Sequence, residues 1–507
     1  MAHSTTIAPT RGLGRRAARG GVVTIAGQMV RIAVQVASLA ILVRLLSPAA
    51  FGYVAMVTAI VGIAELIREF GLSKAAVQAP VLTRAQRDNL FWLNAGLGLA
   101  LSVLVLAVAP LVAALYGEPL LEPVTRCLAV VFLLNGFGAQ FRASLQRDLR
   151  FTALAVLETL GPAAGLAAAV AVALQGGSYW ALVAQQVVTT AVVAVGPACV
   201  AGWWPGRPRR SASIRPMLGY GGSLFGTQAL TYVGNNVDTV VIGLTAGPAA
   251  AGLYNRVYQL VKLPVSQLNA PITRVALPVL ARIQDDPPRY ARYLRQGQLV
   301  LLNVLVPALA LGWAVAGPLV HLVLGDAWGQ AVPIFSLLVV GGVFQAIGFV
   351  QNWVFLSSGK TGQQFRLNLL TRPAFVVAVL VGSLWGVTGV AAGYALTAVL
   401  QWPVALWWAG RAVPEAQAGR LAVTALRAVA TYSAAAVVAH LAVRAAGLDD
   451  AWLSAGLGAG VMLAVLAAGA AVLPAYRRDL AGCVTAVRVL RGAGARSGRG
   501  DRANERK

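Results

Sequence analysis

Charged side chains are scarce in this sequence. Only 11% of the 507 residues are Asp, Glu, Lys or Arg, whereas 58% are hydrophobic and the mean hydropathy is +0.72. Soluble domains carry about 25% charged residues because they must cover a surface that faces water. The composition therefore excludes an ordinary soluble protein and predicts an integral membrane protein.

Cysteine and histidine are also rare. The three cysteines, Cys127, Cys199 and Cys483, lie far apart in the sequence, and the three histidines are equally scattered. Zinc sites and disulfide frameworks need closely spaced ligands or paired cysteines. We therefore expect no disulfide framework, no metal site and no resident cofactor.

Motifs for covalent chemistry are missing as well. The sequence contains neither a G-x-x-x-x-G-K-[ST] phosphate-binding loop nor an H-E-x-x-H zinc motif. No external loop exceeds about a dozen residues, within the few residues to which helix ends can be predicted. A membrane glycosyltransferase, polymerase or ligase would need a larger loop carrying acid, base or Arg groups. We therefore expect movement of a substrate, and no enzyme activity.

Long apolar segments dominate the chain. A transmembrane helix needs about 20 predominantly apolar residues, and fourteen segments meet this requirement. Their predicted ranges are 20–45, 51–70, 89–115, 123–142, 152–174, 178–202, 216–244, 250–280, 297–324, 331–357, 364–383, 387–410, 424–446 and 452–475. An even number of crossings places both termini on the same side of the membrane.

The basic residues alternate with these segments. Lys and Arg concentrate in both tails and after every second segment, whereas the other loops hold acids such as Glu118 and Asp326, with Arg444 as the one basic residue nearby. The positive-inside rule then predicts that both termini are cytoplasmic. Topology explains the net charge of +24, so we expect no nucleic-acid partner.

Two short patterns recur one six-helix unit apart. Pro48-Ala-Ala-Phe-Gly52 follows the first segment, and Pro248-Ala-Ala-Ala-Gly252 follows the seventh. A Pro-to-Gly pattern at 110–117 likewise returns at 318–325. Because six is an even number, the repeats are parallel, related by an axis along the membrane normal. The predicted fold is all-α, with two six-helix repeats and two further helices at the C-terminal end.

This repeat predicts the domain organisation. The predicted parts are a cytoplasmic basic tail (1–19), an N-terminal lobe (20–205), a cytoplasmic linker (206–215), a C-terminal lobe (216–412), two more helices (424–475) and a second cytoplasmic basic tail (476–507).

Polar side chains follow one face of two predicted helices. The segment 20–45 carries Thr24, Gln28, Arg31 and Gln35 in steps of 4, 3 and 4, and the segment 250–280 carries a longer stripe that begins at Asn255. Polar groups are costly at bilayer depth and face a cavity or a partner helix. We predict a hydrated cavity whose cations bind phosphate. The predicted substrate-binding residues are Gln28, Arg31, Gln35, Asn255, Arg256, Gln259 and Lys262.

Three acids within predicted helices are candidates for coupling to a proton or sodium gradient. They are Glu65, Glu158 and Asp238. For each single polar residue an alternative stays open. The side chain can instead form an interhelical hydrogen bond or an internal ion pair, such as Glu65 with Arg68.

Five segments carry a resemblance to a known family. They read RLLSPAAFGY (44–53), ELIREFGLS (65–73), YWALV (179–183), NVDTVVIG (236–243) and NAPITRVALP (269–278). In this order they resemble Wzx-type polysaccharide flippases of the multidrug/oligosaccharidyl-lipid/polysaccharide (MOP) exporter superfamily, over residues 20–410. The resemblance implies a MATE-like fold, a cationic cavity and alternating access. It also implies a polyprenyl-diphosphate-linked oligosaccharide as cargo, moved to the outer leaflet of a bacterial inner membrane.

The expected partners are this lipid-linked oligosaccharide and membrane lipids, with glycan polymerases or glycosyltransferases as further candidates. Two alternative functions stay open. A cation-coupled multidrug exporter of the same superfamily would favour an acidic or aromatic cavity. A non-transporting scaffold of a glycan-assembly complex would tolerate substitutions in the cavity.

Overall fold

The computed structural model describes residues 13–68, 82–209 and 215–483, with side chains described in 27–68, 82–209 and 232–483. Every regular element in these ranges is a helix. The chain divides into two compact units, Met1–Asn255 and Arg256–Lys507. This division is based on contacts between residues, whereas the domains predicted from the sequence are based on the six-helix repeat. The domain boundaries given above therefore stay a prediction.

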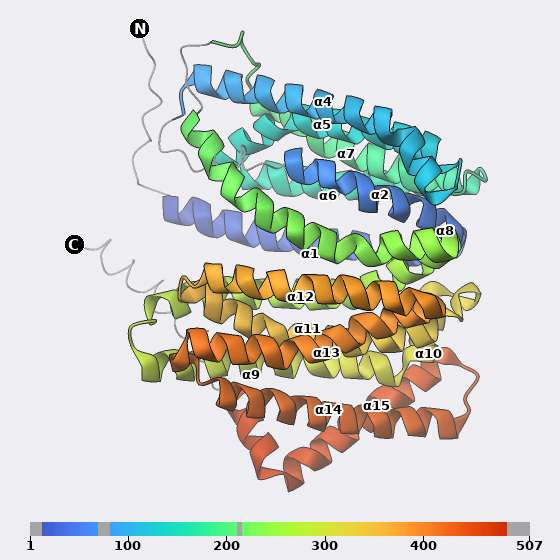
Figure 1. Cartoon of the computed structure of the whole chain (residues 1–507), viewed down its shortest axis with the longest axis vertical. Coiled ribbons are helices and arrows are strands. Elements are labelled where there is room, and N and C mark those ends of the chain that lie inside the picture. Colours follow the sequence, from blue (N-terminus) through green and yellow to red (C-terminus); the bar gives the residue numbers. More distant parts are fainter. Residues whose placement is uncertain (1–12, 69–81, 210–214, 484–507) are drawn as a thin grey trace. The chain divides into compact units, whose positions relative to one another are not determined.

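The first unit is a bundle of long helices (Figure 1). Its members are α1 (Leu13–Leu45), α2 (Pro48–Arg68), α4 (Arg84–Tyr116), α5 (Leu121–Arg147), α6 (Phe151–Leu174), α7 (Trp180–Ala201) and the first part of α8 (Arg215–Arg282). Helix α4 packs on α5, α6 on α7, α5 on α7 and α1 on α6. Small residues allow this: a Cβ built on Gly98 of α4 would lie 2.8 Å from the Cα of Gly136 on α5, a close approach typical of membrane helix pairs.

The second unit contains the rest of α8 and a second bundle with two additional helices. Its members are α9 (Pro287–Ala314), α10 (Ala316–Leu324), α11 (Ala331–Ser357), α12 (Thr361–Gly382), α13 (Gly386–Ala412), α14 (Ala418–Ala446) and α15 (Ala451–Val472), with 3₁₀ turns at Asp326–Trp328, Ser383–Trp385 and Pro414–Ala416. Helix α11 packs on α9 and α13, α12 on α13, and α14 on α9 and α15. A further helical segment, 474–483, follows α15.

Local sequence explains where several helices begin and end. The hydroxyl of Thr83 accepts a hydrogen bond from the backbone N–H of Gln86, and the side-chain oxygen of Gln86 accepts one from the backbone N–H of Thr83, so that α4 starts with a capping box. Gly117 ends the same helix with a φ of 67°. Helix α8 is interrupted at Gly247, whose φ of 80° and ψ of −177° are accessible to glycine and not to residues with a side chain.

The predicted crossings agree with the observed helices. Twelve stretches in the described part of the chain are long and apolar enough to span a membrane. Two of them, Tyr232–Arg282 and Thr361–Ala412, contain 51 and 52 residues, enough for two crossings each. They are interrupted at Gly247 and at Ser383–Trp385. The chain is therefore a multi-pass membrane protein with the predicted succession of helices.

One predicted segment differs in detail. The range 297–324 was expected to form one helix, but the structure breaks it at Val315, between α9 and α10. Pro318 lies in the first turn of α10 and has no N–H to donate to the preceding turn. A proline is tolerated there at the start of a new helix and disfavoured inside a continuous one.

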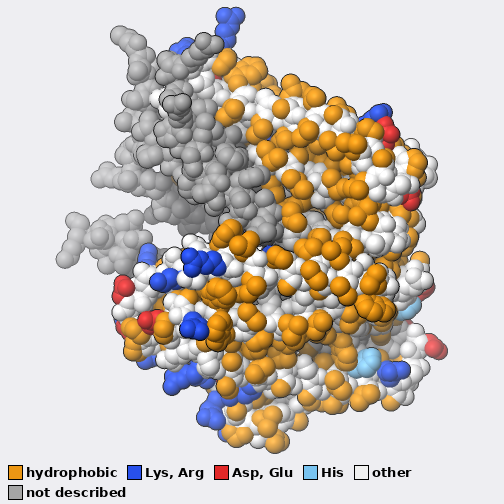
Figure 2. All heavy atoms as spheres, viewed as in Figure 1, with side chains coloured by type: hydrophobic (Ala, Val, Ile, Leu, Met, Phe, Trp, Pro, Cys, Tyr) orange, Lys and Arg blue, Asp and Glu red, His pale blue; other side chains and the backbone are white. Residues whose placement is uncertain are grey.

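The surface matches a protein embedded in lipid. Figure 2 shows hydrophobic side chains along the helices of the second unit, with Lys and Arg gathered at one end of them. Large apolar side chains such as Leu384, Trp385 and Trp452 are more than two-thirds exposed. Tryptophans near helix ends are typical of the membrane–water interface.

Candidate functional site

The polar face of α1 contacts two neighbouring helices of the first unit. The guanidinium of Arg31 forms an ion pair with Glu158 of α6, with 3.4 Å between Nη1 and Oε2, and donates a hydrogen bond to Gln28. About two turns further along α1, the amide of Gln185 on α7 donates to the hydroxyl of Ser38 at 2.6 Å. Gln35, on the same face, is exposed.

The Arg31–Glu158 pair joins two residues for which the sequence predicts different roles, one in substrate binding and one in ion coupling. The side chains are 33% and 44% exposed, so both remain accessible to a ligand. An Arg–carboxylate pair that is partly open can exchange its carboxylate for a phosphate, because guanidinium binds both in the same bidentate geometry. The pair therefore provides a cation at bilayer depth with an exchangeable partner.

Glu65 pairs with a cation on its own helix. Arg68 Nε donates to Glu65 Oε2 at 2.8 Å, and the Arg68 side chain is 9% exposed, whereas that of Glu65 is 35% exposed. This is the internal ion pair considered as the alternative for these residues. The role of Glu65 in ion coupling stays a prediction.

Asp238 is the most deeply buried of the three predicted coupling acids. It is 2% exposed. The hydroxyl of Tyr254 donates to its Oδ2 and the backbone N–H of Thr239 to its Oδ1, each at 2.8 Å. Tyr254 lies beyond the break at Gly247, so this hydrogen bond joins the two arms of α8. Burying an ionised carboxylate is costly. Protonation of Asp238 would therefore change the interactions around it more than protonation of an exposed acid would.

The second predicted stripe divides between the two units. Asn255 ends the first unit, and Arg256, Gln259 and Lys262 belong to the second. Arg256 and Gln259 are partly buried, whereas Lys262 is exposed, with its ammonium 5.3 Å from the centre of the Tyr258 ring. The first unit therefore holds the α1 stripe and Asn255, and the second unit holds Arg256, Gln259 and Lys262.

The far end of the second stripe serves helix packing. Thr273 donates to the side-chain oxygen of Asn269 at 3.0 Å and accepts from the indole N–H of Trp353, on α11, at 2.9 Å. Thr273 therefore has the interhelical role that the sequence left open, and Asn269 bonds to Thr273 within α8.

The two copies of the Pro-to-Gly pattern contact each other, which sequence reasoning did not predict. A Cβ on Gly52 would lie 1.7 Å from the carbonyl oxygen of Pro248, and a Cβ on Gly252 would lie 1.9 Å from that of Pro48. The start of α2 and the part of α8 after Gly247 thus meet backbone to backbone. The contact is reciprocal, as expected for elements related by a two-fold axis. The equal Pro-to-Gly spacing was the signal that could have indicated it.

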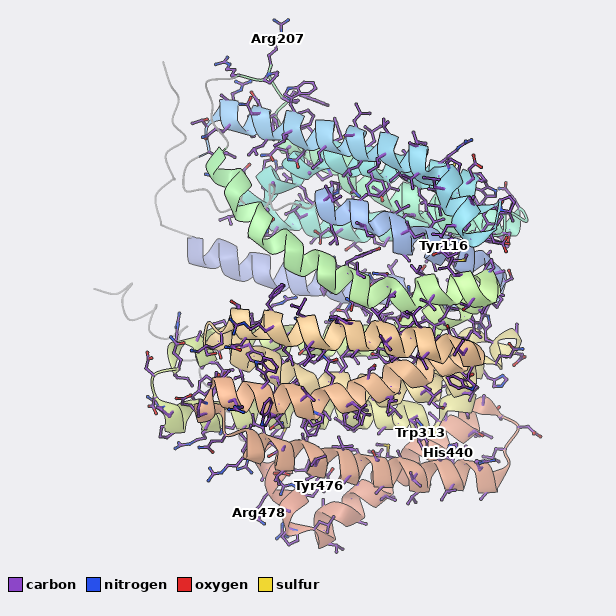
Figure 3. The ribbon with its side chains drawn as sticks, viewed as in Figure 1. Tyr116, Arg207, Trp313, His440, Tyr476 and Arg478 are labelled. Atoms are coloured by element: carbon purple, nitrogen blue, oxygen red, sulfur yellow. The ribbon has the colours of Figure 1, made fainter. Side chains whose placement is uncertain are left out.

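Nearby, Tyr232 of α8 packs against α2. The hydroxyl of Tyr232 donates to the carbonyl oxygen of Thr58 at 2.8 Å, and a Cβ on Gly62 would lie 1.9 Å from that hydroxyl. Side chains of Met56 and Tyr116 occupy the space beside Gly243, and Tyr116 is labelled in Figure 3. In the described ranges, no three His, Cys, Asp or Glu side chains are grouped closely enough to share a metal ion.

Comparison with known proteins identifies related sequences. Residues 41–333, more than half of the chain, match the family described as "Polysaccharide biosynthesis protein". The chain is 28% identical over 371 residues to the lipopolysaccharide biosynthesis protein WzxC of Escherichia coli (strain K12), covering 71% of this chain and 74% of that one. It is 27% identical over 354 residues to the teichuronic acid biosynthesis protein TuaB of Bacillus subtilis (strain 168), covering 68% and 72%.

Solved structures share the fold. The lipid II flippase MurJ in an inward closed conformation aligns with a TM-score of 0.71 at 12% identity, covering 89% of this chain and 99% of that one. An inward-facing multidrug resistance MATE family transporter of the MOP superfamily aligns with a TM-score of 0.62 at 12% identity, covering 78% and 98%. The chain belongs to the polysaccharide biosynthesis protein family and shares the fold of MurJ and of this MATE transporter.

Proposed function

We propose that this protein is a flippase that moves a polyprenyl-diphosphate-linked oligosaccharide from the cytoplasmic to the outer leaflet of a bacterial inner membrane, for surface polysaccharide biosynthesis. The family, the polysaccharide-related names of its relatives and the fold shared with a lipid II flippase support the class of cargo. The observation that carries the proposal is the half-open pair of Arg31 and Glu158 on the polar face of α1.

In the proposed mechanism, the cargo diphosphate displaces Glu158 from Arg31. A diphosphate carries more negative charge than a carboxylate and binds guanidinium through two parallel hydrogen bonds. The amides of Gln28 and Gln35 follow on the same face of α1 and hydrogen-bond the phosphates and the first sugar. The polyprenyl chain stays in the lipid throughout, so no free energy is spent on moving its apolar surface into water.

Release of Glu158 links cargo binding to a gradient. Once displaced, the carboxylate has lost its cationic partner and can interact with a proton or a sodium ion instead. Proton or sodium movement through Glu158, Asp238 and Glu65 then drives the return step. No resident cofactor and no covalent step are needed, and the protein is a transporter rather than an enzyme.

The second stripe provides the contacts that alternate with those of α1. Arg256, Gln259 and Lys262, with Asn255 before them, carry the same mixture of cations and amides. Glycosyltransferases supply the cargo on the cytoplasmic side, where both termini lie by the positive-inside rule, and a glycan polymerase consumes it outside.

The test is removal of the cation at Arg31. In a strain that lacks the native gene, Arg31→Gln should lower surface polysaccharide and make lipid-linked oligosaccharide accumulate on the cytoplasmic leaflet. A charge-assisted hydrogen bond contributes about 1.5–3 kcal/mol, so we expect a loss of at least tenfold. Arg31→Lys should retain part of the activity because the charge remains.

The matched control is Arg44→Gln, an exposed arginine in the last turn of the same helix. It should leave transport unchanged. If Arg31→Gln supports as much surface polysaccharide as Arg44→Gln at equal protein levels, the cationic site on α1 is refuted.

The MATE-like fold makes multidrug export the second candidate function. Cationic drugs would favour an acidic or aromatic face, whereas the α1 stripe presents Arg31 with two amides. A strain without the protein should keep its drug susceptibility and lose its polysaccharide. The reverse result would favour the exporter. A scaffold would instead show normal polysaccharide in every variant of the two stripes.

A further inference from the structure

A pocket of about 460 Å³ opens at one end of the second unit. None of the residues that line it belongs to either polar stripe. Three segments form its walls: the start of α9, the turn before α14, and the helical segment 474–483 that follows α15. Its polar lining includes Arg292, Arg295, Gln296, Gln417, Arg420 and Arg478. Figure 2 shows Lys and Arg gathered at this end, and Figure 3 labels Tyr476 and Arg478 on the third wall.

Four guanidinium groups face this pocket, and all four side chains are exposed. In the described part of the chain, none of them has a carboxylate within 4.0 Å. Arg478 Nε donates to the carbonyl oxygen of Pro474 at 3.2 Å, which orients that side chain. Four like charges at one site repel one another, so they favour an anion among them.

The acid in the lining does not neutralise these arginines. Asp479 is 7% exposed, and it is bound to Arg427 of α14, with 2.7 Å between Oδ2 and Nε and 3.0 Å between Oδ1 and Nη2. The nearby Asp286 caps α9 and lies 3.7 Å from the guanidinium of Arg289. The net charge that faces the pocket is therefore strongly positive.

The walls of the pocket are fixed by buried contacts. Tyr476 donates to the hydroxyl of Tyr432 at 3.4 Å, and Tyr432 donates to the side-chain oxygen of Asn303, on α9, at 2.5 Å. The amide of Gln298, which is 1% exposed, donates to the carbonyl oxygen of Leu421 at 3.1 Å. These hydrogen bonds join α9, α14 and the segment 474–483. The arginines are thus held on a rigid frame.

The level of the pocket relative to the membrane also follows from the helices. Arg420 lies in the first turn of α14, and Arg478 lies six residues after the end of α15. Both therefore lie where apolar helices leave the hydrocarbon, which is the depth of lipid phosphates. Helix α14 begins here without a side-chain cap, and its N-terminal dipole adds to the attraction for an anion.

We propose that this arginine pocket binds the phosphate headgroup of an anionic membrane phospholipid. The guanidinium groups hold the phosphate oxygens, and the acyl chains lie along the apolar surface of α14 and α15. The bound lipid joins the two C-terminal helices to α9 and stabilises the second unit. Basic pockets between transmembrane helices bind lipid phosphates by the same chemistry.

The experiment uses the full-length protein in nanodiscs of phosphatidylcholine, with phosphatidylglycerol as the probe. Bound phosphatidylglycerol is counted by native mass spectrometry after release from the nanodisc. Each arginine near a membrane surface contributes about 1 kcal/mol to attraction of anionic lipid. The double variant Arg292→Gln/Arg295→Gln should therefore bind phosphatidylglycerol about 30-fold more weakly.

Two further variants keep the test independent of folding. Arg292→Lys/Arg295→Lys retains both charges and should bind within a few-fold of the wild type. Arg44→Gln/Arg444→Gln removes two exposed arginines elsewhere and should bind like the wild type. Equal phosphatidylglycerol binding by the wild type and the Arg292→Gln/Arg295→Gln variant would overturn the proposal.

Inorganic diphosphate distinguishes a lipid from a soluble anion. Because it has no acyl chains to add to its affinity, millimolar diphosphate should displace little phosphatidylglycerol. Complete displacement at that concentration would mean that the pocket takes a soluble phosphate, and the lipid assignment would be wrong. Transport by the Arg31 variants does not enter this test, so its outcome is separate from that of the proposed cargo.

Discussion

The reciprocal contact of the two Pro-to-Gly patterns leads to a quantitative prediction for Gly52→Ala. In the structure, a Cβ at this position would lie 1.7 Å from the carbonyl oxygen of Pro248, 2.5 Å from its carbonyl carbon and 2.9 Å from its Cα. All three obstacles are backbone atoms, so no side chain can rotate away. The same holds in reverse for Gly252, whose Cβ would meet the backbone of Pro48.

The cost of this substitution can be estimated from overpacking. The two backbones would have to separate by roughly 1.5–2 Å to restore ordinary van der Waals contact. Overpacking a tight interior costs about 1–3 kcal/mol. We expect a cost near the upper end of this range, because backbone atoms cannot rotate away as side chains can. About 3 kcal/mol shifts the equilibrium between the closed and the open contact by roughly 150-fold.

In the proposed alternating-access cycle this contact forms in one state and opens in the other, so a shift of this size should block the cycle. Gly52→Ala and Gly252→Ala should each lower transport of lipid-linked oligosaccharide at least tenfold while the purified protein keeps its helical circular dichroism. Ala50, which is 1% exposed, offers a second measurement. As a single cysteine it should react slowly with maleimide in the wild type and quickly in the Gly52→Ala background.

Two other glycines serve as controls. Gly96 of α4 has nothing within 4 Å of a built Cβ, so Gly96→Ala should be silent. Gly98→Ala would meet Gly136 across a helix pair inside the first unit and should lower the unfolding temperature without changing the labelling at position 50. The reasoning fails if Gly52→Ala transports normally and leaves the Ala50→Cys site protected.

Further predictions concern the ion pairs and the C-terminal part. Glu158→Gln should leave cargo binding intact but make transport independent of the proton or sodium gradient, measured in vesicles with an imposed gradient. Asp238→Asn should keep the hydrogen bond across the α8 break and reduce the same coupling; unchanged coupling would exclude this acid. Tyr432→Phe removes two hydrogen bonds and should lower the free energy of unfolding by about 1–3 kcal/mol, measured by chemical denaturation. Burial raises the pKa of the Cys483 thiol, so at pH 8 it should react with maleimide more slowly than free cysteine in the same buffer; an equal rate would contradict this.

Much of the fold was predictable because it depends on local properties. Helix length and apolarity are read along the chain. The predicted segments match the helices to within about seven residues at each end, except that α9 begins ten residues before the predicted 297 and ends at the break at Val315. The break at Val315 was missed because Pro318 can be read either as a kink within a helix or as the first turn of a new one. The side of the membrane on which the termini lie remains a prediction from charge alone.

The candidate site was predictable in part. The steps of 4 and 3 on α1 placed Gln28, Arg31 and Gln35 on one face, because helical periodicity is local. The partner of Arg31 was not predictable, since Glu158 lies 127 residues away and its sequence neighbourhood carries no mark of the contact. The same applies to the arginine pocket, which draws on three separate segments.

The sequence by itself determined that the chain crosses the membrane many times, that its cations lie at alternate helix ends, and that its two parts repeat a Pro-to-Gly pattern. These are properties of composition and spacing, and they do not depend on how the helices pack against one another. Only the tertiary structure decided that Gly52 and Gly252 meet the opposite prolines, and that Arg31 shares its charge with Glu158. Such contacts join residues far apart in sequence, and the close packing of small residues between helices selects them.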